Sequence, residues 1–303
     1  MNEKAVLTAP KHLRKVRLGS VLIHLFMIFI LLIILIPVLN LVAKTVSDPV
    51  KVSMMNGWQI WPSGFSLINY RIILSNDTFW QSLINSVVIT VTGTLISVLL
   101  TSSAAYVLTR PNLPGKQAIM VFLIVAMIVE PTIIQEYFVM KDFGILNKLW
   151  CMILYNSVNI YYLIVLMRFF SDTPQPIMEA AKIDGANELQ TLFRVFLPVN
   201  RVPIITIGMF YAVIKWNEYY RSSVFLTAQG KMVVQVFLRK FVVDGETSYI
   251  FTGQGFLFNS IADLSLSALK DAAIVVSVIP ILLLYPIILK YFTSGVLSGS
   301  VKE

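Results

Sequence analysis

The chain has 303 residues, of which 57% are hydrophobic and 13% are charged, and its mean hydropathy is +0.77. A soluble domain of this size carries roughly 25% charged residues, so this composition excludes an ordinary soluble domain and indicates a membrane protein. The net charge is +8, but the Lys and Arg residues lie in tails and loops between apolar stretches and form no nucleic-acid patch. The single cysteine, Cys151, excludes a disulfide framework.

The chain begins with a basic segment over residues 1–19. Residues 10–19 (PKHLRKVRLG) alternate basic and apolar side chains. This pattern predicts either an interfacial helix on anionic lipid or an orientation signal and nothing more. The apolar stretch that follows is too long for a signal peptide, and no small-residue cleavage site closes it. We therefore expect a retained first membrane span.

Six stretches are apolar over about the 20 residues that are needed to cross the hydrocarbon core of a bilayer. They are residues 20–43, 82–108, 118–138, 148–170, 204–226 and 271–292. The expected fold is therefore an all-α membrane protein with a six-helix transmembrane domain over 20–292 and a short tail at 293–303.

Short loops rich in Lys and Arg favour the cytoplasmic side of a membrane. Such loops precede the first span, join the second and third spans at 109–117, and join the fourth and fifth at 171–203. We therefore expect both termini in the cytoplasm of a bacterial cell, with the chain in the plasma membrane. The longer segments 44–81 and 227–270 are then external, and we expect them to carry lateral helices and contacts with an outside partner.

A polar segment rich in helix signals interrupts the apolar pattern at residues 172–198. The residues DTP at 172–174 predict a helix start, because a side-chain oxygen there can cap free amides and proline is tolerated in the first turn. The helix is expected to run to Asp184, where Gly185 supplies a left-handed terminator.

A second short helix is predicted to follow at once. Asn187 and Gln190 have the spacing of a capping box, and Pro198 is expected to end the helix. Two short helices that meet at a glycine form a compact protrusion, and Phe193, Val195 and Phe196 are expected to pack it back onto the membrane helices. The alternative is an ordinary cytoplasmic loop held by its own caps.

The string EAAKIDGANELQTLFRVFLP (179–198) resembles the EAA loop of permease subunits of bacterial ATP-binding-cassette (ABC) importers. In that family the loop is the socket for the ATPase subunit, and the fold is the type I importer permease fold. The resemblance implies that small residues allow close approach to the ATPase and that carboxylates meet its cations. The residues implied in this coupling are Glu179, Ala180, Ala181, Asp184, Gly185, Ala186, Phe193 and Pro198.

The resemblance extends over most of residues 80–303. The segment 143–170 and the pair Trp216-Asn217 resemble carbohydrate-type, MalG-like permeases. The string VVQVFLRKFV (233–242) and the ending YFTSGVLSGSVKE (291–303) resemble the LplC/YtcP-like branch, which handles complex oligosaccharides. There the tail reaches between two ATPases, which implies contacts from Gly299, Val301 and Lys302, although Glu303 stands where the branch usually has glycine.

The resemblance also implies the partners of the chain. They are a second, different permease subunit, two copies of an ABC ATPase, an extracellular sugar-binding lipoprotein or periplasmic binding protein, and membrane lipids. ATP and Mg²⁺ are expected on the ATPase, since this chain has no G-x-x-x-x-G-K-[ST] phosphate loop. We expect no cofactor, no metal site and no catalytic residues in this chain, and no nucleic-acid partner.

Polar residues within apolar spans usually face a cavity or one another. At 1.5 Å per residue, those of the third to fifth spans fall at a similar depth, which suggests a polar belt that contacts substrate hydroxyls. The candidates are Glu130, Asn156, Asn159, Lys215, Trp216, Asn217, Glu218 and Tyr219, with Tyr161, Tyr162 and Tyr211 as further ring surfaces. The alternatives are an ion pair of Lys215 with Glu130 or Glu218, and asparagines that join helices.

The sequence thus predicts half of an oligosaccharide translocation pore that a separate ATPase drives. One rival is an ion-gradient-driven secondary transporter that uses Glu130 and Glu218 as proton carriers. It leaves the polar 172–198 segment unexplained, and no internal repeat typical of such transporters is visible. A second rival is a membrane scaffold without a pore, in which the polar span residues have no purpose. Whether the sugar is neutral or contains uronic acids is left open.

Overall fold

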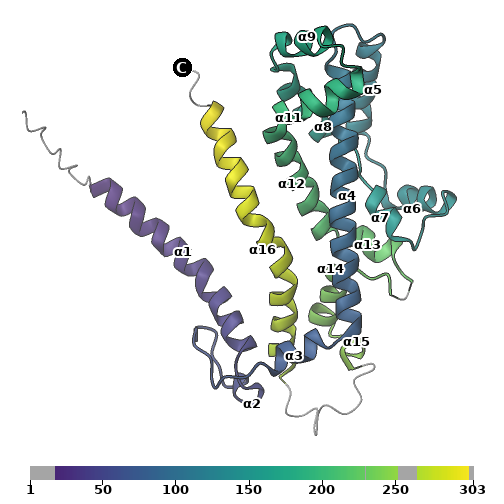
Figure 1. Ribbon diagram of the computed structural model, residues 1–303. Coiled ribbons are helices and arrows are strands. Elements are labelled where there is room, and N and C mark those ends of the chain that lie inside the picture. The colour runs from purple at the N-terminus through teal and green to yellow at the C-terminus, as the bar shows by residue number, and fades with distance from the viewer. Residues whose placement is uncertain (1–17, 229, 252–264, 300–303) are drawn as a thin grey trace, which may run out of the picture. The chain divides into compact units, whose positions relative to one another are not determined.

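The computed structural model describes residues 18–228, 230–251 and 265–299 (Figure 1). Their regular secondary structure is helical, with no strand in these ranges. The chain divides into two compact units, Met1–Asn69 with Ala262–Asp271 and Tyr70–Ile261 with Ala272–Glu303. The tail residues Val301 and Lys302 and most of the basic N-terminal segment lie outside the described residues.

The first unit contains α1 (Leu18–Thr45) and α2 (Pro49–Val52), and α3 (Ile68–Leu74) begins in it. The part of α1 from Gly19 to Thr45 is long and apolar enough to cross a membrane, as the sequence predicts for the first span. None of its most apolar window is buried within the chain. The helix therefore presents an apolar surface on all sides.

The second unit is built around α4 (Asp77–Thr109), a helix of 33 residues. Helices α7 (Leu149–Leu154), α8 (Ile160–Ser171) and α12 (Arg201–Asn217) pack along it (Figure 1). Small residues allow α4 and α12 to approach closely: a Cβ atom added at Gly208 would lie 3.1 Å from the side chain of Val98. Close approach through small residues is typical of helix pairs in membranes.

Three of the expected spans are interrupted. Helices α5 (Lys116–Ile128) and α6 (Ile133–Asp142) meet at a bend of 117°. Residues 148–170 form α7 and α8 instead of one helix, and α12 ends before α13 (Tyr220–Phe225). Across the described residues, three helices are long and apolar enough to cross a membrane, or five if each bent pair counts as one.

Short helices occupy the two ends of the second unit (Figure 1). At one end lie α9 (Gln175–Ile183), α10 (Glu188–Gln190), η1 (Thr191–Phe196) and α11 (Leu197–Val199). At the other lie α14 (Val234–Leu238), η2 (Arg239–Val243) and α15 (Ser248–Phe251). The last helix, α16 (Leu266–Gly299), starts before the predicted sixth span and contains Pro280 and Pro286.

Candidate functional site

The turn at the centre of the EAA loop (172–198) has the geometry that the sequence predicts. Gly185 has φ +75°, a left-handed conformation that glycine adopts without steric cost. Its N–H donates to the carbonyl of Lys182 at 3.1 Å, and the N–H of Ala186 donates to the carbonyl of Ala181 at 3.0 Å. These two bonds form a Schellman motif, which ends α9 and fixes the direction of the next helix.

The predicted capping box starts that next helix. The Asn187 side chain accepts from the Gln190 N–H at 2.9 Å, and the Gln190 side chain accepts from the Asn187 N–H at 3.0 Å. The helix continues past Pro198 to Val199, one residue beyond its expected end. The chain then bends by 86° into α12.

The expected start of the loop is wrong in one respect, because Asp172 does not cap α9. Helix α8 continues to Ser171, so Asp172 becomes its C-terminal residue and donates its N–H to the carbonyl of Phe169 at 3.2 Å. Pro174 takes the cap position of α9 and provides no side-chain hydrogen bond. The hydroxyl of Thr173 donates instead to the side chain of Asn200 at 3.1 Å, which ties the two ends of the loop together.

The face of the EAA loop that packs on the second unit is aromatic. The Phe196 ring lies 4.9 Å from Tyr106 and 4.7 Å from Phe170, both in edge-to-face geometry, and is 4% exposed. Leu192, one turn earlier, is also buried. Phe196 therefore packs as expected, whereas Phe193 does not, since its side chain is 49% exposed.

The outward face of the EAA loop is apolar at its tip. Ile183 is 86% exposed and Leu189 is 68% exposed, and with Phe193 they form a set that we call the tip patch. Glu179, Ala180, Asp184 and Gly185 are exposed beside it. Ala181 is buried inside the loop, so it is unavailable to a partner in this structure, contrary to expectation. Exposed apolar side chains clustered on a protruding loop mark an interaction site.

A polar clamp joins the EAA loop to the end of α4. The Glu188 carboxylate accepts from the Arg110 guanidinium at 2.6 Å and from the Tyr106 hydroxyl at 2.8 Å. The guanidinium also donates to that hydroxyl and lies 4.2 Å from the centre of the Tyr106 ring. We call these three residues the 106–110–188 clamp. The sequence pattern singles out none of them, because the basic residues of the 109–117 loop predict only its orientation.

A cavity of about 480 Å³ adjoins this clamp. The turn at 110–114 forms one wall, and Met178, Glu179 and Lys182 of α9 form another. The cavity opens beside the exposed carboxylate of Glu179, so a partner that covers the EAA loop can also reach α4.

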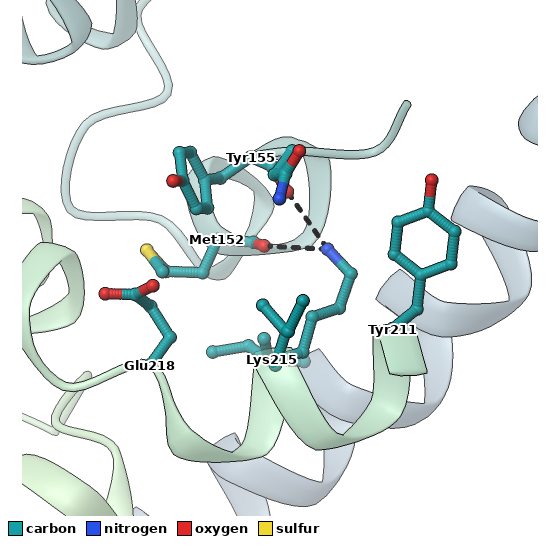
Figure 2. Close-up of a pocket in the computed structure, with 8 residues that line it drawn as sticks. Met152, Tyr155, Tyr211, Lys215 and Glu218 are labelled. Atoms are coloured by element: carbon teal, nitrogen blue, oxygen red, sulfur yellow. Dashed lines mark hydrogen bonds between the residues drawn. The ribbon is translucent and has the colours of Figure 1, made fainter. Parts of the chain in front are cut away.

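Lys215 caps the end of a neighbouring helix (Figure 2). Its ammonium group donates to the carbonyls of Met152, Ile153 and Tyr155 at 3.5, 3.1 and 3.0 Å, and the residue is 8% exposed. These carbonyls belong to the C-terminal end of α7, where a cation is favourable. Lys215 forms no salt bridge with Glu130 or Glu218, so neither expected ion pair is present.

Gly93 of α4 makes room for the Lys215 side chain. A Cβ atom at this position would lie 2.7 Å from Cδ and 2.8 Å from Cε of Lys215. These distances are well below van der Waals contact, so no other residue fits unless the lysine moves. Nothing in the sequence pattern links these two residues, which are 122 positions apart.

The two asparagines of the fourth expected span are turn and cap residues. Asn156 has φ +49°, which asparagine tolerates better than most residues. The Asn159 side chain accepts from the Tyr162 N–H at 3.1 Å and so caps α8. The backbone N–H of Asn159 donates to the hydroxyl of Tyr211 at 2.9 Å, and that hydroxyl lies 2.7 Å from the hydroxyl of Thr101.

A carboxylate–guanidinium network lies next to these interruptions. Arg221 donates to both carboxylate oxygens of Glu136, at 2.7 and 3.3 Å. Glu218 accepts from the Arg221 N–H at 3.0 Å, and the guanidinium lies 4.7 Å from the ring centre of Tyr155. Neither Arg221 nor Glu136 was singled out from the sequence, although both are charged residues in apolar stretches and that is the signal that could have found them.

Glu130 lies in the break between α5 and α6. Pro131 follows it and favours a non-helical conformation of the preceding residue, and Thr132 begins α6 with a capping box. Glu130 is exposed. The break therefore has a local cause in the sequence VEPT (129–132), and it leaves the carboxylate uncovered by the chain.

Three of the eight polar candidates line one cavity in the structure. Asn156, Lys215 and Glu218 line a cavity of about 10 Å³, together with Tyr155 and Tyr211 (Figure 2). This is about the smallest cavity that admits one water molecule, so no sugar fits there in this conformation. Trp216 is buried, whereas Asn217 and Tyr219 are exposed at the end of α12.

The aromatic candidates divide in the same way. Tyr211 is buried, and Tyr162 lies between Tyr211 and Phe210 with ring centres 5.1 and 5.7 Å away. Tyr161 is 61% exposed. Among the described residues, no group of three or more His, Cys, Asp or Glu side chains is placed to hold a metal ion.

Helices long and apolar enough to cross a membrane define the class as a membrane protein. Residues 97–298 match the family described as the inner membrane component of binding-protein-dependent transport systems. The chain belongs to this family of permease subunits of ABC importers. It is therefore a transport component in a bacterial inner membrane.

Individual relatives agree with the family. The polygalacturonan/rhamnogalacturonan transport system permease protein YtcP of Bacillus subtilis is 37% identical over 95% of this chain and 99% of that protein. The protein LplC of the same species is 30% identical over 89% of this chain and 90% of that protein. A chain in the crystal structure of a bacterial ABC transporter involved in the import of the acidic polysaccharide alginate is 26% identical, with a TM-score of 0.82, and the match covers 94% of this chain and all of the other.

Proposed function

We propose that this chain forms half of the translocation pore of an ABC importer for oligosaccharides that contain uronic acids. Two similar proteins carry names or titles that refer to acidic polysaccharides, polygalacturonan/rhamnogalacturonan and alginate. The oligosaccharide class also agrees with the resemblance of residues 233–242 and 291–303 to the branch that handles complex oligosaccharides. The other half of the pore is a second, different permease, and a sugar-binding lipoprotein or periplasmic protein delivers the substrate.

The EAA loop is the proposed docking site for the ATPase subunit. The observation that carries this proposal is the exposed tip patch of Ile183, Leu189 and Phe193 on a loop whose turn and caps fix its shape. An isolated cytoplasmic loop has no reason to expose three large apolar side chains, whereas a docking surface gains free energy when a partner covers them. The exposed carboxylates of Glu179 and Asp184 stand ready for cations of the partner.

The 106–110–188 clamp supports a mechanical role for this docking. Glu188 lies one position before Leu189 of the tip patch, and its carboxylate is bonded to two side chains at the end of α4. When ATP binding closes the two ATPases, a displaced EAA loop therefore pulls on the longest helix of the second unit. In this proposal the movement alternates access to the pore, and hydrolysis on the ATPase resets it.

The proposed sugar path uses the exposed members of the polar belt. Glu130, Asn217 and Tyr219 are exposed, and Tyr161 adds an exposed ring. Asn156, Asn159, Lys215, Trp216 and Glu218 are the supporting members, because their polar groups bond within the chain or are buried. A proton-carrier role for Glu218 has little support, since Arg221 holds its carboxylate.

The expected orientation belongs to the same proposal. With both termini in the cytoplasm, the EAA loop and the 109–117 loop face the ATPase, and the end of α16 at Gly299 approaches it too. ATP and Mg²⁺ then bind to the ATPase alone. A cysteine at Asp184 should react with a membrane-impermeant maleimide only after the cells are opened, and labelling of intact cells would contradict this orientation.

Co-purification from native membranes tests the docking proposal. We expect the tagged wild-type chain to bring down a second permease and the ATPase. The variants Leu189→Glu/Phe193→Glu and Gly185→Pro should lose the ATPase and keep the second permease, because the first charges the tip patch and the second cannot adopt φ +75°. Val243→Glu is the matched control, since Val243 is an exposed apolar residue at the other end of the unit. Retention of the ATPase by both loop variants would contradict the proposal.

Uptake assays test the substrate class separately. We expect cells to take up oligogalacturonides in preference to neutral oligosaccharides of the same length. Glu130→Ala and Asn217→Ala should lower uptake and leave assembly intact. Loss of assembly in these variants would indicate a structural role, and preferential uptake of a neutral sugar would replace the substrate class and leave the docking proposal standing.

A further inference from the structure

The loop that follows α1 exposes aromatic side chains to an unusual degree. Trp58 is 79% exposed, Trp61 is 74% exposed and Phe65 is 75% exposed, and Met54 beside them is 83% exposed. We call residues 54–65 the aromatic loop. These four large apolar side chains are exposed within one short loop, and such surfaces mark contact with a protein or a membrane.

The backbone of the aromatic loop is held in place by polar side chains that point inward. The Asn40 amide donates to the carbonyls of Asn56 and Gln59, at 3.0 and 2.6 Å. The Gln59 amide donates to the Ser63 hydroxyl at 2.8 Å, and the Ser63 N–H donates to the Ser47 hydroxyl at 3.0 Å. The polar groups of the aromatic loop therefore form hydrogen bonds with α1 and within the loop, whereas the rings of Trp58, Trp61 and Phe65 are exposed.

These bonds fix the depth of the loop along α1. Asn40 is the first polar side chain after His24 in the apolar stretch that begins at Gly19. At 1.5 Å per residue, Asn40 lies about 30 Å from Gly19, which is about the thickness of the hydrocarbon core of a bilayer. The segment from Asn56 to Gln59 is bonded to Asn40, so Trp58 lies near the boundary between hydrocarbon and headgroups.

Tryptophan is enriched at this boundary in membrane proteins, because its ring is apolar and its N–H is polar. Two further features favour lipid as the occupant. The aromatic loop continues the surface of α1, whose most apolar window is wholly unburied by the chain. Lys44 in the last turn of α1 and the exposed Lys51 place cations where lipid phosphates lie.

We propose that the aromatic loop is an interfacial anchor that inserts into the headgroup region of the leaflet opposite the N-terminus. Trp58 and Trp61 then fix the depth and tilt of α1, with Phe65 and Met54 in contact with the upper acyl chains. This role does not depend on the docking or substrate proposals above, because it concerns the bilayer alone.

Spin-label accessibility tests the anchor in the assembled complex reconstituted into phosphatidylcholine/phosphatidylglycerol vesicles. Single cysteines replace Trp58 and Trp61 in a complex without other reactive cysteines; the native Cys151 is buried and stays. A nitroxide on each is measured with oxygen, which partitions into lipid, and with a nickel chelate, which stays in water. Phe29→Cys near the middle of α1 and Asp244→Cys on an exposed turn provide the lipid and water references.

We expect labels at Trp58 and Trp61 to show intermediate depths between the two references, with oxygen accessibility above that of the nickel chelate. Nickel accessibility equal to that of the Asp244 label would place the loop in water and overturn the proposal. Low accessibility to both reagents would show that a protein covers the loop, which also overturns it. Labels at Met54→Cys and Phe65→Cys repeat the measurement if a tryptophan variant fails to assemble.

Discussion

Helices end within the chain in two kinds of place. One is the EAA loop, and the other is the set of three interruptions of the expected spans, at 129–132, 155–159 and 218–219. In the EAA loop, backbone bonds around Gly185 and a capping box close the helix ends locally. The side chains of the tip patch take no part in closing these helix ends, and they stay exposed. At the interruption after α7, a side chain from another helix, Lys215, closes the helix end.

This difference separates the residues that we propose for binding a partner from the residues that hold the fold together. A helix end in an aqueous loop can leave carbonyls to water, whereas a helix end within a membrane must find donors inside the protein. Polar side chains at the interruptions are therefore needed to form hydrogen bonds with the unpaired backbone groups of these helix ends. The proposed sugar path therefore uses residues that remain exposed, such as Glu130 and Asn217.

The largest effect is expected when the network around Arg221 is broken. Arg221→Leu leaves the carboxylates of Glu136 and Glu218, which are 12% and 15% exposed, without their cation. Removing one partner of a largely buried ion pair costs about 3–5 kcal/mol. Thermal unfolding of the purified complex should show a large loss of stability. Arg168→Leu is the matched control, because its guanidinium is 81% exposed and 3.9 Å from Asp172, and equal losses in the two variants would contradict this ranking.

Removal of the Lys215 ammonium should have the next largest effect. Lys215→Met keeps the side-chain length, but it deprives the carbonyls of Met152, Ile153 and Tyr155 of their donor. Each buried group left unsatisfied costs about 1–3 kcal/mol, so a total loss of about 3 kcal/mol is expected. Asn217→Ala is the control, because the Asn217 amide bonds only to its own helix at Val213.

The same variant also distinguishes the two roles of Lys215. If it is a cap, stability falls in Lys215→Met and the preference among sugars is unchanged in the transporter that still assembles. An unchanged melting temperature combined with a selective loss of acidic-sugar uptake would show instead that the ammonium group binds substrate.

The architecture of the EAA loop was predictable because its signals are local. Gly185, Asn187 and Gln190 act on residues no more than five positions away, so their spacing in the sequence already contains the geometry. The error at Asp172 arose because its neighbour Ser171 extends α8, and the length of that helix depends on packing against α4. The exposure of Phe193 and the burial of Phe196 likewise depend on which face meets Tyr106.

The polar belt was harder to predict because its contacts are long-range. Depth counting predicts one layer for Asn156, Lys215 and Glu218, and these three residues line a common small cavity. It assumes continuous helices, however, and the structure interrupts the third, fourth and fifth expected spans. The partners of Lys215 are backbone carbonyls that lie 60 to 63 positions away in the sequence. Every residue has a backbone carbonyl, so the sequence gives no signal for such a contact.

A smaller effect on stability, but a specific effect on coupling, is expected at the 106–110–188 clamp. Glu188→Gln keeps the shape of the side chain and removes the charge that Arg110 contacts. Because Glu188 is 65% exposed, the loss of stability should be at most about 1 kcal/mol. The ATPase should still co-purify and hydrolyse ATP, while sugar uptake per ATP falls several-fold. Glu246→Gln, at an exposed site in the same unit, serves as the control, and an unchanged ratio in both would remove the clamp from the coupling pathway.

The smallest effect is expected for Asn156→Gly, at the position where the comparison between the two regions is sharpest. Asn156 has φ +49°, the left-handed conformation that often ends a helix. In the EAA loop the same conformation is adopted by a glycine, Gly185, with φ +75°. Asn156→Gly should therefore change stability by no more than about 0.5 kcal/mol, whereas Asn156→Val should cost about 1–2 kcal/mol. If Asn156 serves only the backbone, uptake remains normal in the glycine variant and falls in the valine variant together with the melting temperature. Loss of uptake in a glycine variant of unchanged stability would show that the amide contacts the sugar, and this interruption would then bind a ligand, as we propose that the EAA loop binds the ATPase.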